Sequence, residues 1–100
     1  INSGGEKIFA EEVEMAIASH PAVIDVVVAG RPSERWGQEV VAVVALADGA
    51  SVDATELVAH AGTTIARYKL PKAIVFRPVI QRSPAGKADY RWAREMVTNG

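Results

Sequence analysis

The chain has 100 residues, of which 49% are hydrophobic and 23% are charged, and its formal net charge is -1. This length and composition are typical of one small globular domain with a single core, and the balanced charge gives no basic surface for nucleic-acid binding. Cysteine is absent, which excludes disulfides, thiolate metal sites and a cysteine nucleophile.

The first predicted element is an amphipathic helix that follows a glycine-containing turn. Glu11, Glu12 and Glu14 lie mostly outside its apolar face. Pro21 cannot continue a helix, so the helix should end near His20. The hydrophobic residues of this segment recur at the spacing of one helical face and predict a buried stripe made of Phe9, Val13, Ala16 and Ile17.

Two strands are predicted next. Residues 22–30, AVIDVVVAG, and residues 40–47, VVAVVALA, are rich in β-branched side chains. The polar segment between them, RPSERWGQE, has the composition of a turn. We therefore expect the two runs to pair as antiparallel strands joined by a loop over residues 31–39.

The second half of the chain predicts a helix, a strand and a final helix. Asp53 and Glu56 have the spacing of a capping box, and the hydrophobic stripe behind them consists of Leu57, Val58, Ala61 and Ile65. The segment KAIVFRPV then favours a short third strand. Asp89 can cap a terminal helix that buries Trp92 and Met96. The predicted fold class is α+β, with a small three-stranded sheet and about three helices packed on it.

Two glycines and an arginine–tryptophan pair are the first candidate site residues. Gly4 and Gly5 permit a ligand to approach the backbone closely, or else they make a tight turn. No dinucleotide or Walker pattern accompanies them. Arg35 and Trp36 combine a guanidinium with an aromatic ring, which suits stacking on a base and pairing with phosphate. Trp36 is equally well explained as a core anchor.

Lys87 is the third candidate. It follows Gly86 in the segment QRSPAGKADYRW, among small and turn-forming residues. Most lysines are only solvated surface charges. A long side chain on a loop nevertheless delivers a point charge to an anionic oxygen that a rigid helix would not reach. This placement favours an electrostatic clamp over a general base.

The remaining sequence offers no complete active site. His20 stands at a helix end before a proline, and His60 lies within a helix, so nothing fixes either of them as the base for a serine nucleophile. The two histidines are far apart and lack ligand-spaced carboxylates, so we expect no metal site. No apolar run approaches the roughly 18 residues of a membrane-spanning helix. We therefore expect a soluble, cytoplasmic domain without a transmembrane segment.

Four segments together resemble a known family. They are GGEKIFAEEVEMAIASHPAVIDVVVAGRP, RWGQEVVAVVAL, IARYKLPKAIVF and QRSPAGKADYRW. Their order and spacing are similar, over essentially the whole chain, to the small C-terminal domain of adenylate-forming acyl-CoA synthetases. The resemblance implies that residues 1–100 are a single domain, the mobile C-terminal lid of a larger acyl-CoA ligase. The start at Ile1, without a methionine, agrees with a piece of a longer polypeptide.

Enzymes of this family convert a carboxylic acid to an acyl-adenylate with ATP and magnesium, and then pass the acyl group to coenzyme A. The resemblance therefore implies ATP or AMP, coenzyme A and Mg²⁺ as cofactors, bound mainly by an N-terminal domain that these 100 residues do not include. The expected partners are that N-terminal domain, a carboxylic acid, of the fatty type, and coenzyme A. The fragment alone is expected to be inactive.

The resemblance also implies roles for particular residues. Lys87 matches the family's catalytic lysine, which bridges the substrate carboxylate and the phosphate derived from ATP. Gly86 stands before it in the same motif and is grouped with the cofactor-binding positions. The domain then rotates to present a second face for thioester formation. Four residues match segments that meet coenzyme A in that second arrangement: Gly4, Gly5, Arg35 and Trp36. Further candidates for phosphate contacts are Lys7, Arg67, Lys69 and Lys72.

The match has two departures and leaves two alternatives. Gln81 stands where a proline is common and Ser83 where a threonine is common, and neither change touches Gly86 or Lys87. One alternative is an adenylating domain that serves a carrier protein instead of coenzyme A. The other is a non-catalytic binding module of the same fold.

Overall fold

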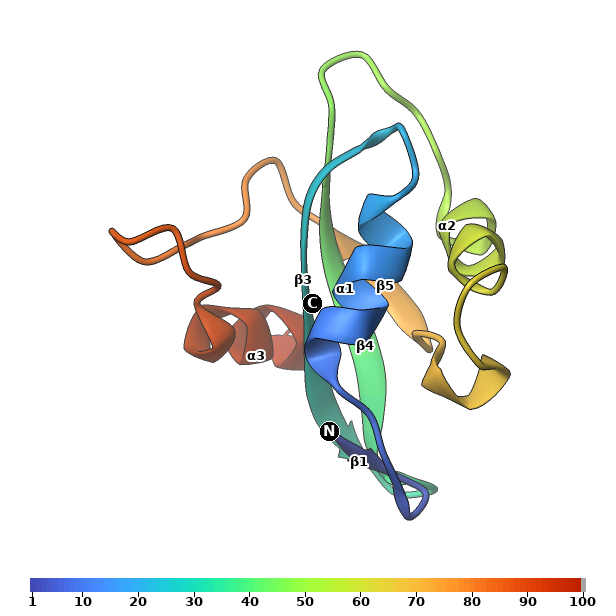
Figure 1. Cartoon of the computed structure of the whole chain (residues 1–100). Helices are drawn as coiled ribbons and strands as arrows, with labels where there is room; N and C mark the ends of the chain where they lie inside the picture. The colour runs from blue at the N-terminus through green and yellow to red at the C-terminus, as the bar shows by residue number, and fades with distance from the viewer. Residues whose placement is uncertain (100) are drawn as a thin grey trace.

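The computed structural model describes residues 1–99 (Figure 1). The helices over these residues are α1 (Ala10–Ala18), α2 (Ala54–Ala61) and α3 (Tyr90–Asn99). The strands are β1 (Asn2–Ser3), β2 (Glu6–Lys7), β3 (Val23–Ser33), β4 (Gly37–Leu46) and β5 (Ala73–Phe76), and a short 3-10 helix, η1 (Arg67–Lys69), precedes β5. None of the helices within residues 1–99 has the length and apolarity that crossing a membrane requires.

The main sheet has the strand order β3–β4–β5. β3 and β4 pair antiparallel, as predicted, with Val27 opposite Val43. The pairing continues to Ser33 opposite Gly37, so the loop predicted over residues 31–39 is limited to residues 34–36. β5 lies parallel to β4 on its other side. Figure 1 shows α1 and α2 on one face of this sheet and α3 on the other. A second, two-stranded sheet joins β1 to β2. The predicted α+β class with a three-stranded sheet and three helices is confirmed.

The central strands are buried on both faces. Alternate residues point to opposite sides of a strand, so each valine run serves two layers at once. The side covered by α1 and α2 receives Val26, Val28, Val40, Ala42 and Val44. The side covered by α3 receives Val27, Ala29, Val41, Val43 and Ala45. No polar or charged side chain within residues 1–99 is buried between these layers, so the groups available for chemistry lie outside the two core clusters.

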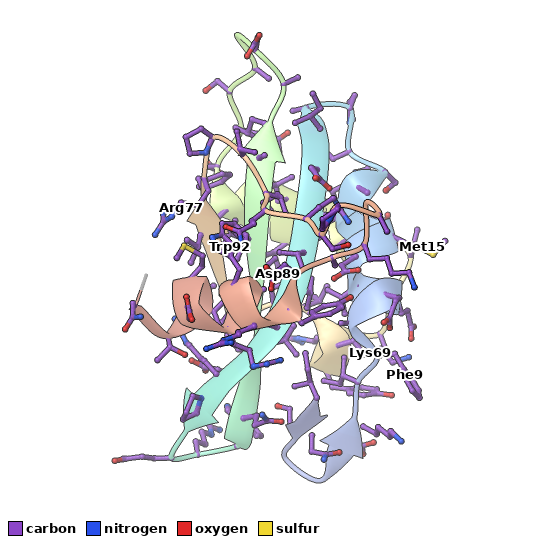
Figure 2. All side chains as sticks on the ribbon, turned by 90° about the vertical axis from the view of Figure 1, so that its left-hand side faces the viewer. Phe9, Met15, Lys69, Arg77, Asp89 and Trp92 are labelled. Carbon is purple, nitrogen blue, oxygen red and sulfur yellow. The ribbon has the colours of Figure 1, made fainter. Side chains whose placement is uncertain are left out.

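The first helix differs from its prediction at both ends. Val13, Ala16 and Ile17 are buried as expected, but Phe9 precedes the helix and is 57% exposed. Ile8 is buried instead. Figure 2 shows Phe9 and Met15 projecting outward on the α1 side. The helix also ends at Ala18, two residues before the predicted limit near His20.

The second helix is shorter than its hydrophobic stripe. Asp53 caps it as predicted, because its Oδ1 accepts a hydrogen bond from the Glu56 backbone N–H at 2.8 Å. The helix stops at Ala61, and Gly62 forms its C-terminal cap. Ile65 therefore lies outside the helix, although it still packs against the same core cluster. Because Ile65 continues the apolar spacing beyond the helix end, the helix predicted from the sequence was too long.

The last helix is capped as predicted, but it buries different residues. Asp89 Oδ1 accepts a hydrogen bond from the Trp92 backbone N–H at 3.0 Å, and this bond lowers the pKa of the Asp89 carboxyl group. Ala93 and Val97 are fully buried, whereas Trp92 and Met96 are only partly buried at the edge of the same cluster. Figure 2 shows Asp89 at the start of this helix. Small side chains face the sheet because the helix packs closely onto it.

Candidate functional site

Lys87 lies on a tight hairpin. Arg82 and Ala88 form a β-bridge at its base. Within it, the Ser83 backbone N–H donates to the Lys87 carbonyl oxygen at 2.8 Å, and the Gly86 N–H donates to the Ser83 carbonyl oxygen at 2.8 Å. Gly86 has a φ of 80°, a conformation that glycine adopts without steric cost. A glycine in this position is typical of short hairpin loops, so the local sequence fixes where Lys87 stands.

The Lys87 side chain projects into solvent. The residue is exposed, and its ammonium group makes no salt bridge with any other residue in the range 1–99. Figure 1 shows the segment between β5 and α3 extending away from the sheet. The predicted placement of a lone cation on a projecting loop is therefore what the structure shows.

Gly4 and Gly5 form the tip of the hairpin between β1 and β2. Their φ values are 58° and 85°, and positive values at both central residues favour glycine in a two-residue hairpin. The Gly4 N–H donates to the Trp36 carbonyl oxygen at 2.8 Å. A Cβ atom added to Gly4 would lie 2.8 Å from Trp36 Cε3, whereas one added to Gly5 would meet nothing within 4 Å. The first glycine therefore makes room for an indole ring.

Two cationic side chains, Arg35 and Lys72, lie over the Trp36 ring. The Arg35 guanidinium lies 4.6 Å from the ring centroid and the Lys72 ammonium lies 5.3 Å from it, both within the range of a cation–π interaction. Trp36 is only partly buried and belongs to neither core cluster. The core-anchor explanation of this tryptophan is therefore wrong, and the residue lines a surface pocket instead.

A pocket of about 460 Å³ opens beside this tryptophan. It is lined by Ser3, Gly4, Glu6, Trp36, Arg67, Tyr68 and Lys72. Two aromatic rings and two cations line a cavity with one carboxylate. These groups suit a planar, anionic ligand, because the rings offer stacking surfaces and the cations offer phosphate contacts. Gly5 and Arg35 belong to the segments that form this pocket but are not among its lining residues.

The structure also distinguishes among the four basic residues that the sequence proposed as phosphate contacts without ranking them: Lys7, Arg67, Lys69 and Lys72. Arg67 and Lys72 line the pocket. Lys69 is bound to Glu12, with its Nζ atom 2.7 Å from Oε1, and this contact raises the pKa of Lys69. Lys7 lies 5.4 Å from the ring centroid of Phe9. Tyr68 was not predicted as a site residue, because a single tyrosine between two basic residues has no motif of its own.

A serine–histidine contact was also missed, because it joins two helices. Ser19 Oγ lies 2.7 Å from His60 Nε2. The serine hydroxyl also donates to the Ala16 carbonyl oxygen at 2.8 Å, a bond that competes with transfer of its proton to His60. His20 Nε2 lies 2.7 Å from Glu56 Oε2. These contacts connect the two residues that follow α1 to α2, and neither forms a nucleophile.

The Lys87 hairpin and the tryptophan pocket are two separate sites. Figures 1 and 2 both show the loop before α3 well away from β1, near the opposite end of the sheet. No residue of the Lys87 hairpin lines the pocket. A chemical role that uses both must therefore use them against different surfaces or at different times.

This chain belongs to the family of AMP-binding enzyme C-terminal domains, whose family model matches residues 12–87. It is 84% identical over all 100 residues to the medium-chain acyl-CoA ligase Mig of Mycobacterium avium, and 57% identical over 97 residues to a 3-oxocholest-4-en-26-oate–CoA ligase of Rhodococcus rhodochrous. The chain spans 18% of the length of each of these relatives.

Solved structures give the same assignment. A fatty acyl CoA synthetase of Mycobacterium tuberculosis superposes with a TM-score of 0.91 and 38% sequence identity, over 99% of this chain and 20% of that one. The resemblance inferred from the four sequence segments is confirmed at the level of the family. The homologous region in each relative is a fifth of the protein or less.

Proposed function

We propose that this chain is the mobile C-terminal lid domain of an ATP-dependent acyl-CoA ligase. The ligase activates a carboxylic acid as its acyl-adenylate with release of pyrophosphate, and then transfers the acyl group to the thiol of coenzyme A with release of AMP. The observation that carries the proposal is Lys87, exposed on a glycine hairpin without a salt-bridge partner among residues 1–99. Membership of the family and the two separate sites support it.

Lys87 acts in the first step. Its ammonium group enters the active site of the N-terminal domain and contacts both the substrate carboxylate and the α-phosphate. These two anions repel each other, so a cation between them lowers the cost of bringing them together. The same charge stabilises the negative charge that develops on the phosphate oxygens in the transition state. Gly86 contributes the turn that lets this side chain project.

The tryptophan pocket acts in the second step. After rotation of the lid, Gly4 and Gly5 line the passage for the pantetheine arm of coenzyme A. The nucleotide end contacts the Trp36 pocket, where the Arg67 and Lys72 side chains face its phosphates and Trp36 and Tyr68 offer ring faces. Arg35 already packs on the Trp36 ring and lies at the edge of this surface.

The acid is proposed to be a medium-chain fatty acid, because the relative with 84% identity carries that description. Because the relative with 57% identity over this domain is described as a ligase of a different acid, 3-oxocholest-4-en-26-oate, we assign the acyl pocket to the N-terminal domain. Within residues 1–99, no three histidine, cysteine or acidic side chains cluster as a metal site. We assign Mg²⁺ to the N-terminal domain and the reaction to the cytoplasm, where its cosubstrates occur.

The test is Lys87→Ala in the full-length enzyme. The rate of adenylation, measured as ATP–pyrophosphate exchange, should fall by roughly 100-fold or more, because a preorganised electrostatic contact is lost. Thioester formation from supplied acyl-adenylate should change little, since Lys87 is withdrawn in that step. Equal loss in both half-reactions would contradict this division of roles. Turnover with free coenzyme A, but not with a carrier-protein thiol, identifies the acceptor.

A further inference from the structure

The hairpin that carries Lys87 is tied to the sheet by a bidentate ion pair. Arg82 Nε donates to Asp25 Oδ2 at 2.9 Å, and Arg82 Nη2 donates to Asp25 Oδ1. Arg82 stands at the base of the hairpin, and its Nη1 also donates to the carbonyl oxygen of Gly86 at 3.4 Å. One guanidinium therefore contacts both the sheet and the residue that precedes Lys87.

Asp25 is a fixed anchor for this contact. It lies on β3 at the register shift between Val23 and Asp25, and such irregularities redirect a side chain from its normal position. Its Oδ1 also accepts from the Val26 backbone N–H at 2.9 Å. The hydrogen bonds from Arg82 hold the pKa of this carboxyl group below its ordinary value of 3.8, so the carboxylate stays ionised under working conditions.

No other side-chain hydrogen bond described within residues 1–99 connects the hairpin to the sheet. Gln81 Nε2 donates to Asp89 Oδ2 at 3.0 Å, but this bond only joins the two ends of the loop to each other. The Ser83 hydroxyl accepts from the Lys87 N–H inside the turn. The Arg82 and Asp25 side chains are about one-third exposed, at 34% and 31%. A paired, partly buried fork of this kind holds its geometry far better than an ordinary surface ion pair.

We propose that Arg82 is a positioning residue for adenylation, and that its bidentate contact with Asp25 sets the orientation of the Lys87 hairpin on the sheet. The inference rests on the proposed role of Lys87. A lid that docks as a rigid body delivers the ammonium group only as accurately as the hairpin is held. A small misplacement of a reacting group is costly, so the loss should fall on the catalytic rate and not on substrate binding.

The experiment is a set of substitutions in the full-length enzyme. Arg82→Lys keeps the charge but removes the planar fork, and Asp25→Asn removes the charge of its partner. Each should lower kcat for adenylation roughly 10- to 100-fold with KM for ATP and acid nearly unchanged. The double variant should be no worse than the worse single variant, because the pair acts as a unit. Thioester formation from supplied acyl-adenylate should be unaffected.

Two further measurements separate positioning from stability. In the Lys87→Ala background, Arg82→Lys should cause no additional loss, because its effect passes through the lysine. The matched control is Arg91→Lys, which alters an exposed pair with Glu95 at 4.0 Å on α3 and should leave both half-reactions unchanged.

The outcomes distinguish the two proposals. If Lys87→Ala leaves adenylation intact, the proposed function itself is wrong. If Lys87→Ala abolishes adenylation while Arg82→Lys and Asp25→Asn retain full kcat, only the positioning role is overturned. Equal loss of both half-reactions together with a lower Tm would show a merely structural ion pair and would also overturn it.

Discussion

The Lys87 hairpin and the tryptophan pocket are built in opposite ways. The hairpin is local: its turn and its lysine come from seven consecutive residues, 82–88, and the only side-chain hydrogen bonds described within residues 1–99 that join it to the sheet are those between Arg82 and Asp25. The pocket is assembled from three separate parts of the chain, the β1–β2 turn, the β3–β4 turn and the segment from η1 to β5. The geometry of the hairpin therefore depends on its own turn and on one anchor to the sheet, whereas the shape of the pocket depends on how three parts of the chain pack.

The strongest expected contrast within the pocket is between Gly4→Ala and Gly5→Ala. Both changes put a side chain on a residue with positive φ, which costs about 1–2 kcal/mol. Only at Gly4 does the new Cβ clash with Trp36, at 2.8 Å from Cε3. Gly4→Ala should displace the ring and slow thioester formation by roughly 10- to 100-fold, and Gly5→Ala should have a smaller effect.

Single-turnover thioester formation from supplied acyl-adenylate measures this difference, with ATP–pyrophosphate exchange as the control that neither glycine change should alter. Trp36→Leu, alone and combined with Gly4→Ala, tests the cause: because the smaller side chain removes the clash, Gly4→Ala should cause little additional loss in the Trp36→Leu background. A further loss as large as that of Gly4→Ala alone would mean that the ring position is not the reason.

A smaller effect is expected when one cation of the pocket is removed. Lys72→Ala should raise KM for coenzyme A by about fivefold, the equivalent of roughly 1 kcal/mol for an exposed charge contact. The effect should shrink as ionic strength rises, since salt screens exposed charges. KM for ATP should not change. Arg91→Ala on α3 is the matched loss of a cation elsewhere, and an equal rise in KM for that variant would reject a specific contact.

The same contrast explains what the sequence could predict. Gly86 and Lys87 were identified as a motif because their neighbours in sequence are their neighbours in space. The valine runs predicted β3 and β4 and their pairing, because strand residues buried on both faces leave a continuous apolar signal. Trp36, Lys72 and Tyr68 come together only through strand pairing and the return of the chain to β5. Their spacing in the sequence therefore gave no sign that they line one pocket.

The errors have physical causes of the same kind. Phe9 continues the apolar spacing of α1 but precedes the helix, and Ile65 continues that of α2 beyond its glycine cap. Trp92 was expected to be buried by the last helix, yet α3 packs closely on the sheet and buries the smaller Ala93. Periodicity reports which residues are apolar and does not report where a helix stops. The Arg82–Asp25 contact spans 57 positions, and single residues at that separation carry no pattern.

The smallest predicted effect concerns Glu14, a residue of α1 that contacts both the edge of the sheet and α3 on the opposite face. Its carboxylate accepts from the Val28 N–H on the outer edge of β3 at 2.8 Å and from the Tyr90 hydroxyl of α3 at 3.1 Å. Burial raises the pKa of Glu14 above its ordinary value of 4.5, against the lowering by these hydrogen bonds and by Arg82, and with a small further rise from Glu11. Burial, together with the charge and hydrogen bond of Glu14, raises the pKa of Tyr90 to about 12.

A raised acid pKa means that the folded state binds the proton more tightly than the unfolded state. The folded protein should therefore lose stability as the pH rises from about 4.5 through the raised pKa of Glu14. Glu14→Gln keeps an oxygen acceptor and removes this titration. The Tm of Glu14→Gln relative to the unsubstituted enzyme should thus increase between pH 4.5 and pH 7, by an amount equivalent to less than about 1 kcal/mol, because the group is only half-buried.

Thermal unfolding of both enzymes across that pH range measures the difference, and Glu95→Gln, an exposed glutamate of α3, is the control that should show no such trend. Neither half-reaction should respond to Glu14→Gln, because this contact holds α1 and α3 on one sheet without touching either site. A selective change in adenylation would mean that the link between α1 and α3 also helps to set the hairpin. The two regions would then be mechanically coupled, in contrast to the independent sites inferred from their separate construction.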